Sequence, residues 1–198
     1  SPTATARPPA VSPTVIAQPT ATPPPAIAPT PTPRPVVFPD DERSHENLIE
    51  WWYYNGHLKA SNDDLFGFHY VIFKAKPPGW PPLLASQLGV TNLTESDHVE
   101  GEAVLLSEKA SSNDHVLLSG GDWELRINED GHFLKGAVGE TSIALELAPQ
   151  RPPTLHNDIG WLSDQSGGWT YYYSWTRMSA TGPIQVNESI SEVDGSAW

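Results

Sequence analysis

A lone carboxylate among aromatic residues is the first feature of this sequence that could do chemistry. Glu50 follows Ile49 and precedes four aromatic residues in a row, at positions 51–54. Burial among apolar side chains raises the pKa of a carboxyl group, and a protonated acid in an apolar cavity can donate a proton to an alkene or an enol. The alternative is a structural carboxylate bonded to an arginine such as Arg177, to a tyrosine or to backbone N–H groups. We predict Glu50 as a catalytic candidate, with this structural alternative open.

Histidines supply the second candidate group. His69 lies between Phe68 and Tyr70, so it could be a polar contact in a pocket, a proton shuttle or a hydrogen-bonded core histidine. His57 and His69 could also face each other across a hairpin, but two histidines without a third ligand make a poor metal site. We therefore predict His69 as a second catalytic candidate, and we expect no metal and no cofactor.

A histidine–aspartate pair and two serines could also carry acid–base or nucleophilic chemistry. His156 and Asp158 precede Gly160 at a spacing that fits an ordinary turn, and we favour the turn while keeping His156 as a ligand contact. The chain has no Gly-x-Ser-x-Gly elbow, and Ser163 and Ser166 lack the context of a catalytic triad. The sequence therefore gives no support to a serine hydrolase.

β-Strands are the elements that must position these groups. Successive side chains of a strand alternate between the two faces of a sheet. Residues 47–58 predict a strand that is aromatic on both faces, so we expect one face to pack on protein and the other to line a cavity or pack under a second sheet. The two faces carry Glu50, Trp52 and Tyr54 on one side and Ile49, Trp51, Tyr53 and His57 on the other.

Short strands separated by turns also account for the rest of the chain after residue 40. The turn at 61–64 joins the first strand to a second at 65–75 as a hairpin, whereas 98–106 fits either a helix or a strand. Such a meander is spaced as in an antiparallel barrel or sandwich, so we predict an all-β protein. The further strands expected are 83–91, 116–119, 123–128, 133–138, 143–147 and 169–178, then a hairpin of 184–190 with 192–198.

Residues 1–39 differ in composition from the rest of the chain. They hold 13 of the 21 prolines and no acidic residue. Such a segment cannot bury enough apolar surface to offset its ordering entropy, so it predicts a disordered linker or a stalk that tethers an extracellular domain. The chain does not begin with a signal peptide. We expect an extracellular or surface-tethered protein whose signal or anchor lies outside this sequence.

Net charge limits the classes of partner, and cysteine content limits the kinds of covalent and metal site. The formal net charge of −13 argues against nucleic acid and anionic membrane surfaces as partners. No apolar run approaches the roughly 20 residues that span a bilayer, so we expect no transmembrane segment. The absence of cysteine excludes disulfides, cysteine-ligated zinc and a thiol nucleophile.

A set of short motifs follows in order along the chain after residue 36. They include Phe38-Pro39-Asp40-Asp41, Glu50-Trp51-Trp52-Tyr53, Phe66-Gly67-Phe68-His69, Pro153-Thr154-Leu155-His156, Tyr171-Tyr172-Tyr173-Ser174 and Gly195-Ser196-Ala197-Trp198. Together they resemble the AttH-like, carotenoid hydratase-like family. The resemblance covers essentially everything after residue 36.

The resemblance implies a lipocalin-like antiparallel β-barrel with a largely apolar cavity, usually two such barrels in tandem. Relatives include carotenoid 1,2-hydratases, a fungal phytoalexin hydratase and fungal cyclases that fold a polyene. Family members often have glutamine at the position of His69, which favours an orienting hydrogen bond there. The chain stops at Trp198, before the acidic residues of the family motif and before a second barrel, which puts catalysis by this chain alone in doubt.

We therefore predict a lipocalin-like barrel over residues 40–198 that binds an apolar isoprenoid, lipid or polyketide-like molecule and resembles hydratases, isomerases or cyclases. One alternative is a carrier without turnover. Another is an adhesion domain that stacks Trp80, Trp161 and Trp169 on sugars. The expected ligand contacts are Trp52, Tyr54, His57, Tyr70, Tyr171, Tyr173 and His156.

Overall fold

One antiparallel sheet forms the body of the described chain, which covers residues 32–104, 107–109, 114–163 and 167–198 of this computed structural model. Its strand order is β4-β3-β2-β1-β15-β14-β9-β8-β7-β6-β5. These strands are β1 (Ile49–Ala60), β2 (Leu65–Ala75), β3 (Leu83–Asn92), β4 (Asp97–Val104), β5 (Ser107–Glu108), β6 (Val116–Gly120), β7 (Trp123–Asn128), β8 (Gly131–Val138), β9 (Thr141–Pro149), β14 (Met178–Val186) and β15 (Ser189–Ala197).

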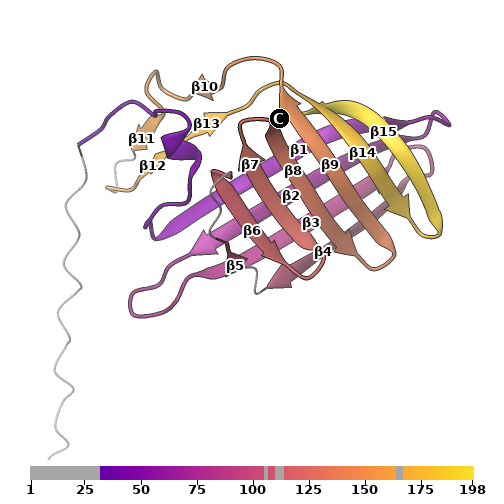
Figure 1. Cartoon of the computed structure of the whole chain (residues 1–198), viewed down its shortest axis with the longest axis horizontal. Coiled ribbons are helices and arrows are strands. Elements are labelled where there is room, and N and C mark those ends of the chain that lie inside the picture. The colour runs from indigo at the N-terminus through magenta and orange to yellow at the C-terminus, as the bar shows by residue number, and fades with distance from the viewer. Residues whose placement is uncertain (1–31, 105–106, 110–113, 164–166) are drawn as a thin grey trace, which may run out of the picture. The chain divides into compact units, whose positions relative to one another are not determined.

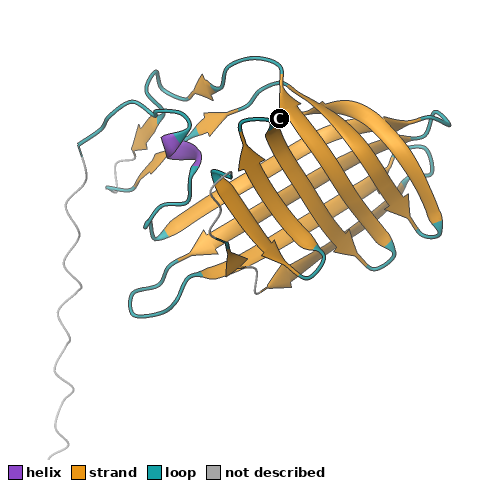
Figure 2. Cartoon of the chain, in the orientation of Figure 1, coloured by secondary structure: helices purple, strands orange, loops and turns teal. Residues whose placement is uncertain are grey.

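The sheet curls until its two halves face each other. Figure 1 shows β1–β4 running behind and across β6–β9, and residues of β8 contact both β3 and β4. Figure 2 shows how little of the described chain lies outside strands and their connecting loops. The predicted all-β fold is confirmed, as a curled antiparallel half-barrel of eleven strands.

Four short strands and one short helix gather at the end of the sheet where β1 begins (Figure 1). The 3-10 helix η1 (Asp40–Glu42) precedes β1. β10 (Thr154–Leu155) pairs with β13 (Tyr173–Ser174), and β11 (Trp161–Ser163) pairs with β12 (Trp169–Tyr171). All four short strands lie in the long connection between β9 and β14.

The C-terminal strands differ from the prediction. The expected strand at 169–178 is divided into β12 and β13, and the chain leaves strand conformation before β14 begins at Met178. The final hairpin pairs β14 with β15, not 184–190 with 192–198, and Val186 lies opposite Ser189 across its turn. Gly182 and Pro183 are residue types that weaken a strand interior. In the structure they lie inside β14.

The core lies between the two halves of the curled sheet. Even-numbered positions of β1 and β2 point inward, and Tyr54, Leu58 and Tyr70 are among the buried side chains. The odd-numbered face points outward, where Ile49 is 57% exposed and Trp51 is 38% exposed. The expectation that neither face of the first strand meets water is therefore wrong at this end of β1.

The compact unit begins at Thr32, earlier than the expected boundary at residue 40. The Val36 backbone N–H donates to the Ile159 carbonyl at 3.1 Å, and the Val36 side chain is buried. Most of the predicted linker, residues 1–31, lies outside the described residues.

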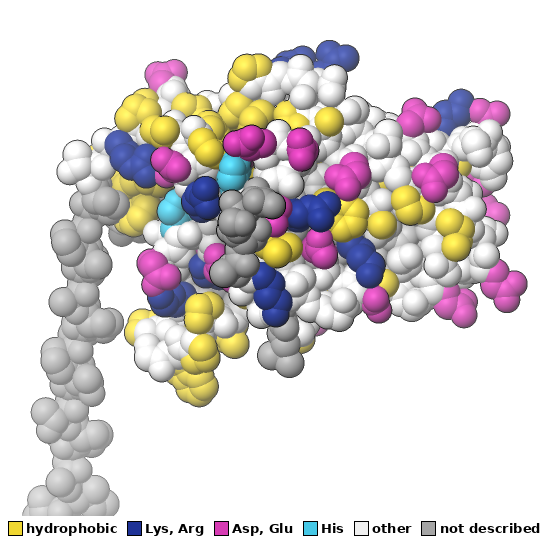
Figure 3. All heavy atoms as spheres, viewed as in Figure 1, with side chains coloured by type: hydrophobic (Ala, Val, Ile, Leu, Met, Phe, Trp, Pro, Cys, Tyr) yellow, Lys and Arg dark blue, Asp and Glu magenta, His cyan; other side chains and the backbone are white. Residues whose placement is uncertain are grey.

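The surface agrees with the acidic composition. Figure 3 shows acidic side chains spread over the viewed face of the sheet, with hydrophobic and basic side chains between them. Among the described residues, no helix has the length and apolar character needed to cross a membrane.

Candidate active site

Glu42, the last residue of η1, is a buried carboxylate at the end of the curled sheet. Because the residue is only 5% exposed, its side chain bonds to other protein groups and not to solvent. The Trp175 indole N–H donates to Glu42 Oε1 at 2.9 Å, and the Trp52 indole N–H reaches the Glu42 carbonyl oxygen at 3.5 Å. Burial raises the pKa of Glu42, and the hydrogen bond from Trp175 and the neighbouring His115 oppose that rise. A carboxyl in this setting is suited to proton transfer.

His132, on β8, is the first of two histidines beside this carboxyl. Its Nε2 lies 4.0 Å from Glu42 Oε1, and its Nδ1 is 2.9 Å from the Tyr54 hydroxyl. Burial lowers the pKa of His132 to about 4, with a smaller contribution from His115 in the same direction. His132 is therefore uncharged at neutral pH, held between the Tyr54 hydroxyl and Glu42.

His115, which precedes β6, is the second histidine and lies at the border with solvent. Its Nδ1 is 3.6 Å from Glu42 Oε2, and its side chain is 12% exposed. Nδ1 is buried and has no hydrogen-bond partner among the described residues. His115 also lines a cleft of about 790 Å³, which we call the His115 cleft. The other residues that line it are Arg43, Asp114, Arg126, Asn128, Glu129 and Asp130.

Aromatic rings pack together beside Glu42. The ring of Trp175 packs edge-on to His132 at 5.9 Å and lies 5.7 Å from the ring of Phe38. Tyr173 packs edge-on to Phe38 at 4.8 Å, and its pKa is raised by burial and then by the charge of Glu42. The site thus joins an apolar aromatic wall to one buried acid and two histidines, a combination that suits an apolar ligand with few polar groups.

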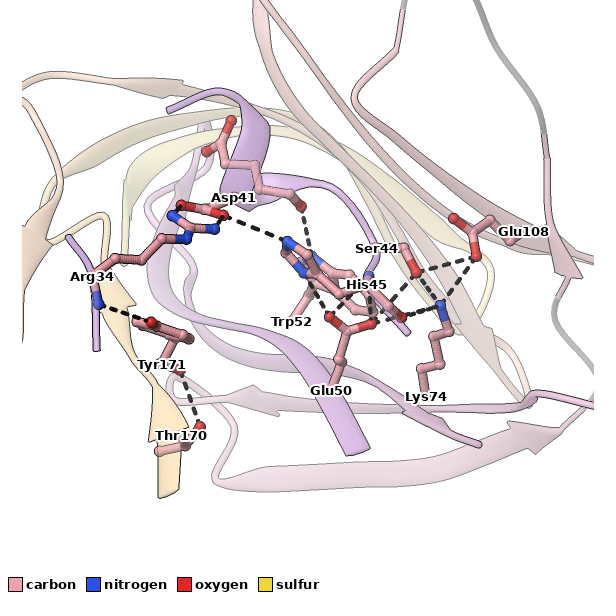
Figure 4. Close-up of polar contacts among 11 residues, drawn as sticks. Arg34, Asp41, Ser44, His45, Glu50, Trp52, Lys74, Glu108, Thr170 and Tyr171 are labelled. Carbon is pink, nitrogen blue, oxygen red and sulfur yellow. Dashed lines mark hydrogen bonds and ion pairs between the residues drawn. The ribbon is translucent and has the colours of Figure 1, made fainter. Parts of the chain in front are cut away.

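Glu50, the carboxylate singled out in the sequence, lies outside this cluster and holds the segment that carries Glu42. Glu50 accepts hydrogen bonds from the backbone N–H of His45 at 2.8 and 3.0 Å, and it lies 2.8 Å from His45 Nδ1. The buried ammonium of Lys74 lies 3.6 Å from Glu50 and donates to the His45 carbonyl and to Ser44. Figure 4 shows these side chains pointing toward one another. This bonding is that of the structural alternative, with Lys74 and His45 in place of Arg177.

A second contact fixes the other end of the same segment. Arg34 pairs with Asp41 through two hydrogen bonds of 2.6 and 2.7 Å, and the Val37 N–H donates to Asp41 at 2.6 Å (Figure 4). The hydrogen bond from Arg34 lowers the pKa of Asp41. We call residues 34–45 with these contacts the clamp segment. It sets the position of Glu42, because Glu42 lies between the two sets of contacts.

Three of the predicted ligand contacts lie beside Glu42, and Tyr70 lies deeper in the core. Trp52 and Tyr54 reach the cluster from β1, and Tyr173 reaches it from β13. Tyr70 is fully buried and donates its hydroxyl hydrogen to the Glu124 carbonyl at 2.9 Å.

The other predicted site residues lie elsewhere. His69 is on the outer face, 2.9 Å from the Asn55 side chain, and His57 is exposed on the same face opposite Gly67. The His156 ring stacks on Tyr172 and lies 3.0 Å from Ser174 Oγ. Tyr171 packs against Trp161 and Trp169 in the β11–β12 hairpin. Catalysis by Glu50 or His69 stays a prediction.

Sequence reasoning missed Glu42, His115 and His132. Glu42 stands in the acidic run Asp40-Asp41-Glu42, which is typical of a solvated turn. The two histidines lie far along the chain, His115 just before β6 and His132 near the start of β8. Only the curl of the sheet brings them to η1. Among the described residues, no group of three or more histidine, cysteine or acidic side chains is arranged to hold a metal ion.

The family and the fold neighbours agree with this architecture. The AttH-like family model matches residues 29–198. The chain belongs to the AttH-like family. No curated protein matches this AttH-like chain. Its fold resembles that of a putative AttH from Nitrosomonas europaea, with a TM-score of 0.74 and 21% identity over 87% of this chain and 56% of that chain.

Kievitone hydratase from Nectria haematococca shares the fold with a TM-score of 0.64 and 9% identity, over 83% of this chain and 51% of that chain. At these identities the likeness is one of fold. This AttH-like chain spans about half the length of both solved neighbours.

Proposed function

We propose that this AttH-like protein binds an apolar molecule at the end of its barrel and transfers a proton to it from Glu42. The observation that carries the proposal is the buried Glu42 carboxyl, whose pKa burial raises, between two histidines and a wall of aromatic rings. Such a carboxyl holds its proton at a higher pH than an exposed one, and the aromatic side chains Trp175 and Tyr173 lie beside it.

The reaction class is hydration or isomerisation of a carbon–carbon double bond. Glu42 donates its proton to one alkene carbon, and a cation forms at the other. In hydration, water adds to that cation and the proton it loses returns to the Glu42 carboxylate. In isomerisation, the cation loses a proton from a neighbouring carbon to the same carboxylate. Both sequences balance without an oxidant, a reductant or a cofactor.

The substrate class proposed is isoprenoid or another polyene lipid, because the wall around Glu42 offers ring faces and few polar partners. A hydratase among the fold neighbours favours hydration over other proton-transfer chemistry. We also propose that the protein is exported, and that a second lipocalin-like domain completes the site in longer members of the family, since both solved neighbours are about twice as long as the matched region.

Deuterium uptake tests this proposal. The full chain is incubated with farnesol or geranylgeraniol in D₂O, the retained ligand is detected by native mass spectrometry, and carbon-bound deuterium is measured in the recovered alcohol. We expect the wild-type protein to retain the isoprenoid and to introduce deuterium, and Glu42→Gln to retain it without deuterium. Retention without deuterium by the wild-type protein would instead establish the carrier alternative, and no retention would reject the apolar ligand.

Glu50→Gln is the matched control, because it makes the same chemical change at the other carboxylate of this region. Because Glu50 holds the segment that carries Glu42, we expect Glu50→Gln to slow deuterium uptake without abolishing it. If Glu50→Gln abolishes uptake while Glu42→Gln does not, the acid is Glu50 and the assignment to Glu42 is wrong.

A further inference from the structure

We propose that His115 carries protons between water in the His115 cleft and the buried carboxyl of Glu42, so that this cleft is the water and proton entrance of the site. The inference rests on the proposed function of Glu42 as a proton donor. It adds the route by which the Glu42 carboxyl exchanges its proton with water, which the aromatic wall around Glu42 leaves undefined.

His115 lies between the cleft and the buried carboxyl of Glu42. His115 lines the cleft together with charged and polar residues, while its Nδ1 faces Glu42 Oε2 at 3.6 Å. Nδ1 is buried and lies just beyond hydrogen-bonding distance of the carboxyl, and a buried polar atom left in this way requires an explanation. A small rotation of the ring would bring Nδ1 within hydrogen-bonding distance of the carboxyl, and such contacts are often long before a ligand binds.

His132 differs from His115 in its access to the cleft. His132 is also close to Glu42, but its Nδ1 is engaged with the Tyr54 hydroxyl and the residue is buried. It is absent from the residues that line the cleft. His132 can therefore orient Glu42, whereas His115 reaches both Glu42 and the cleft.

Charged groups face His115 from two sides. On the inner side it faces Glu42, with His132 behind. The cleft side is lined by Arg43 and Arg126 and by the carboxylates of Asp114, Glu129 and Asp130. The ring therefore lies between the buried carboxyl and the charged lining of the cleft.

The proton passes from cleft water to Glu42 through the two nitrogens of the His115 ring. Cleft water gives a proton to Nε2 of neutral His115, and the resulting imidazolium gives the Nδ1 proton to the Glu42 carboxylate. The ring returns to neutral in the other tautomer. The first tautomer is restored when the ring turns about its Cβ–Cγ bond, Nδ1 takes a proton from cleft water and Nε2 releases one. The same steps in reverse carry away a proton that Glu42 has accepted.

The experiment follows protonation of Glu42 without any ligand. After a rapid drop in pH, time-resolved infrared spectroscopy records the C=O stretch of the protonated carboxyl, and the band missing in Glu42→Gln belongs to Glu42. We expect His115→Ala to slow the appearance of this band on the order of 10²-fold, the scale of a positioned acid–base group. Free imidazole added to His115→Ala should restore most of the rate.

His98→Ala is the matched control, since His98 is an exposed histidine on β4 that pairs with Thr91. It should protonate Glu42 at the wild-type rate. If His115→Ala does not fold, His115→Gln takes its place with the same slow rate expected. The proposal that His115 carries protons to Glu42 would be overturned by a wild-type rate of Glu42 protonation in a folded His115 variant. Failure of imidazole to restore that rate would overturn it as well.

This result is separate from the test of the proposed function. The infrared band reports proton access to Glu42, and deuterium uptake by an isoprenoid reports chemistry on a ligand. A relay that fails while uptake persists would point to another proton route. Uptake that fails while the relay holds would reject the reaction and leave the entrance in place.

Discussion

Trp175 donates its indole N–H to the carboxyl of Glu42 at 2.9 Å, across 133 positions of sequence. The bond joins the connection between β9 and β14 to the segment before β1. It also explains why the expected strand at 169–178 is broken, because Trp175 turns toward the end of the core instead of continuing a regular alternation.

Trp175→Phe should therefore raise the pKa of Glu42 further. The indole N–H lowers that pKa by bonding the carboxylate, and phenylalanine keeps the ring but lacks the donor. We also expect a loss of about 1 kcal/mol in the free energy of unfolding, the usual net value of one hydrogen bond. Titration of the carboxyl by ¹³C NMR on glutamate-labelled protein measures the shift, and an unchanged or lower pKa would contradict the prediction.

Lys74→Met should destabilise the protein by about 3 kcal/mol, because it leaves Glu50 without a buried cationic partner and Ser44 and the His45 carbonyl without a donor. Urea unfolding measures the loss. Lys59→Met is the matched control, since Lys59 forms an exposed pair with Asp63 and should leave stability unchanged. Equal effects at both lysines would show that burial of the Lys74 ammonium does not matter.

Acidification should destabilise the fold through His132. Its pKa is about 4 in the folded state and 6.5, the ordinary value, in the unfolded chain. The unfolded chain therefore binds more protons between these values, and stability falls as pH falls through this window. The shift corresponds to about 3 kcal/mol between pH 6.5 and pH 4. Unfolding free energies of wild type and His132→Phe, compared across this window, isolate the effect. Parallel pH profiles for the two proteins would rule it out.

Gly56→Ala should destabilise the β1–β2 hairpin by about 1–3 kcal/mol, as overpacking of a tight site does. A Cβ at Gly56 would lie 2.6 Å from the Ser196 carbonyl oxygen and would also overlap the ring of Phe68. Gly67→Ala is the control in the same hairpin, because the nearest atom to its added Cβ is 3.9 Å away. Thermal unfolding of both variants checks the difference, and similar losses would mean that close approach is not the reason for glycine at 56.

Most β-strands before residue 150 were predictable, because alternation and turn residues act locally. Residues 98–106 fitted either a helix or a strand, and β4 (Asp97–Val104) lies there. The strand at 65–75 was predicted with the bounds that β2 has, and 123–128 with those of β7. The connection from β9 to β14 was not predictable in this way. Its aromatic residues alternate like a strand, yet Trp175 is bonded to Glu42 and Tyr172 to Tyr53, at 2.5 Å between the hydroxyls.

The candidate site was predictable only in part, for the same reason. The carboxylate at Glu50 drew attention because apolar neighbours in sequence suggest burial, but the structure surrounds it with Lys74 and His45. Glu42 has acidic neighbours in sequence and becomes buried through tertiary contacts alone. Long-range packing, which one sequence does not reveal, decided which of the two acids meets the aromatic wall.

Glu42 belongs to the clamp segment, which precedes the first strand of the sheet. The buried acid and the strands of the sheet therefore belong to separate stretches of the sequence. A chain shortened to begin at Ile49 would keep the sequence of all eleven strands of the sheet and lose the acid. Exchanging the dozen residues of the clamp segment would therefore change the buried acid without altering any strand of the sheet.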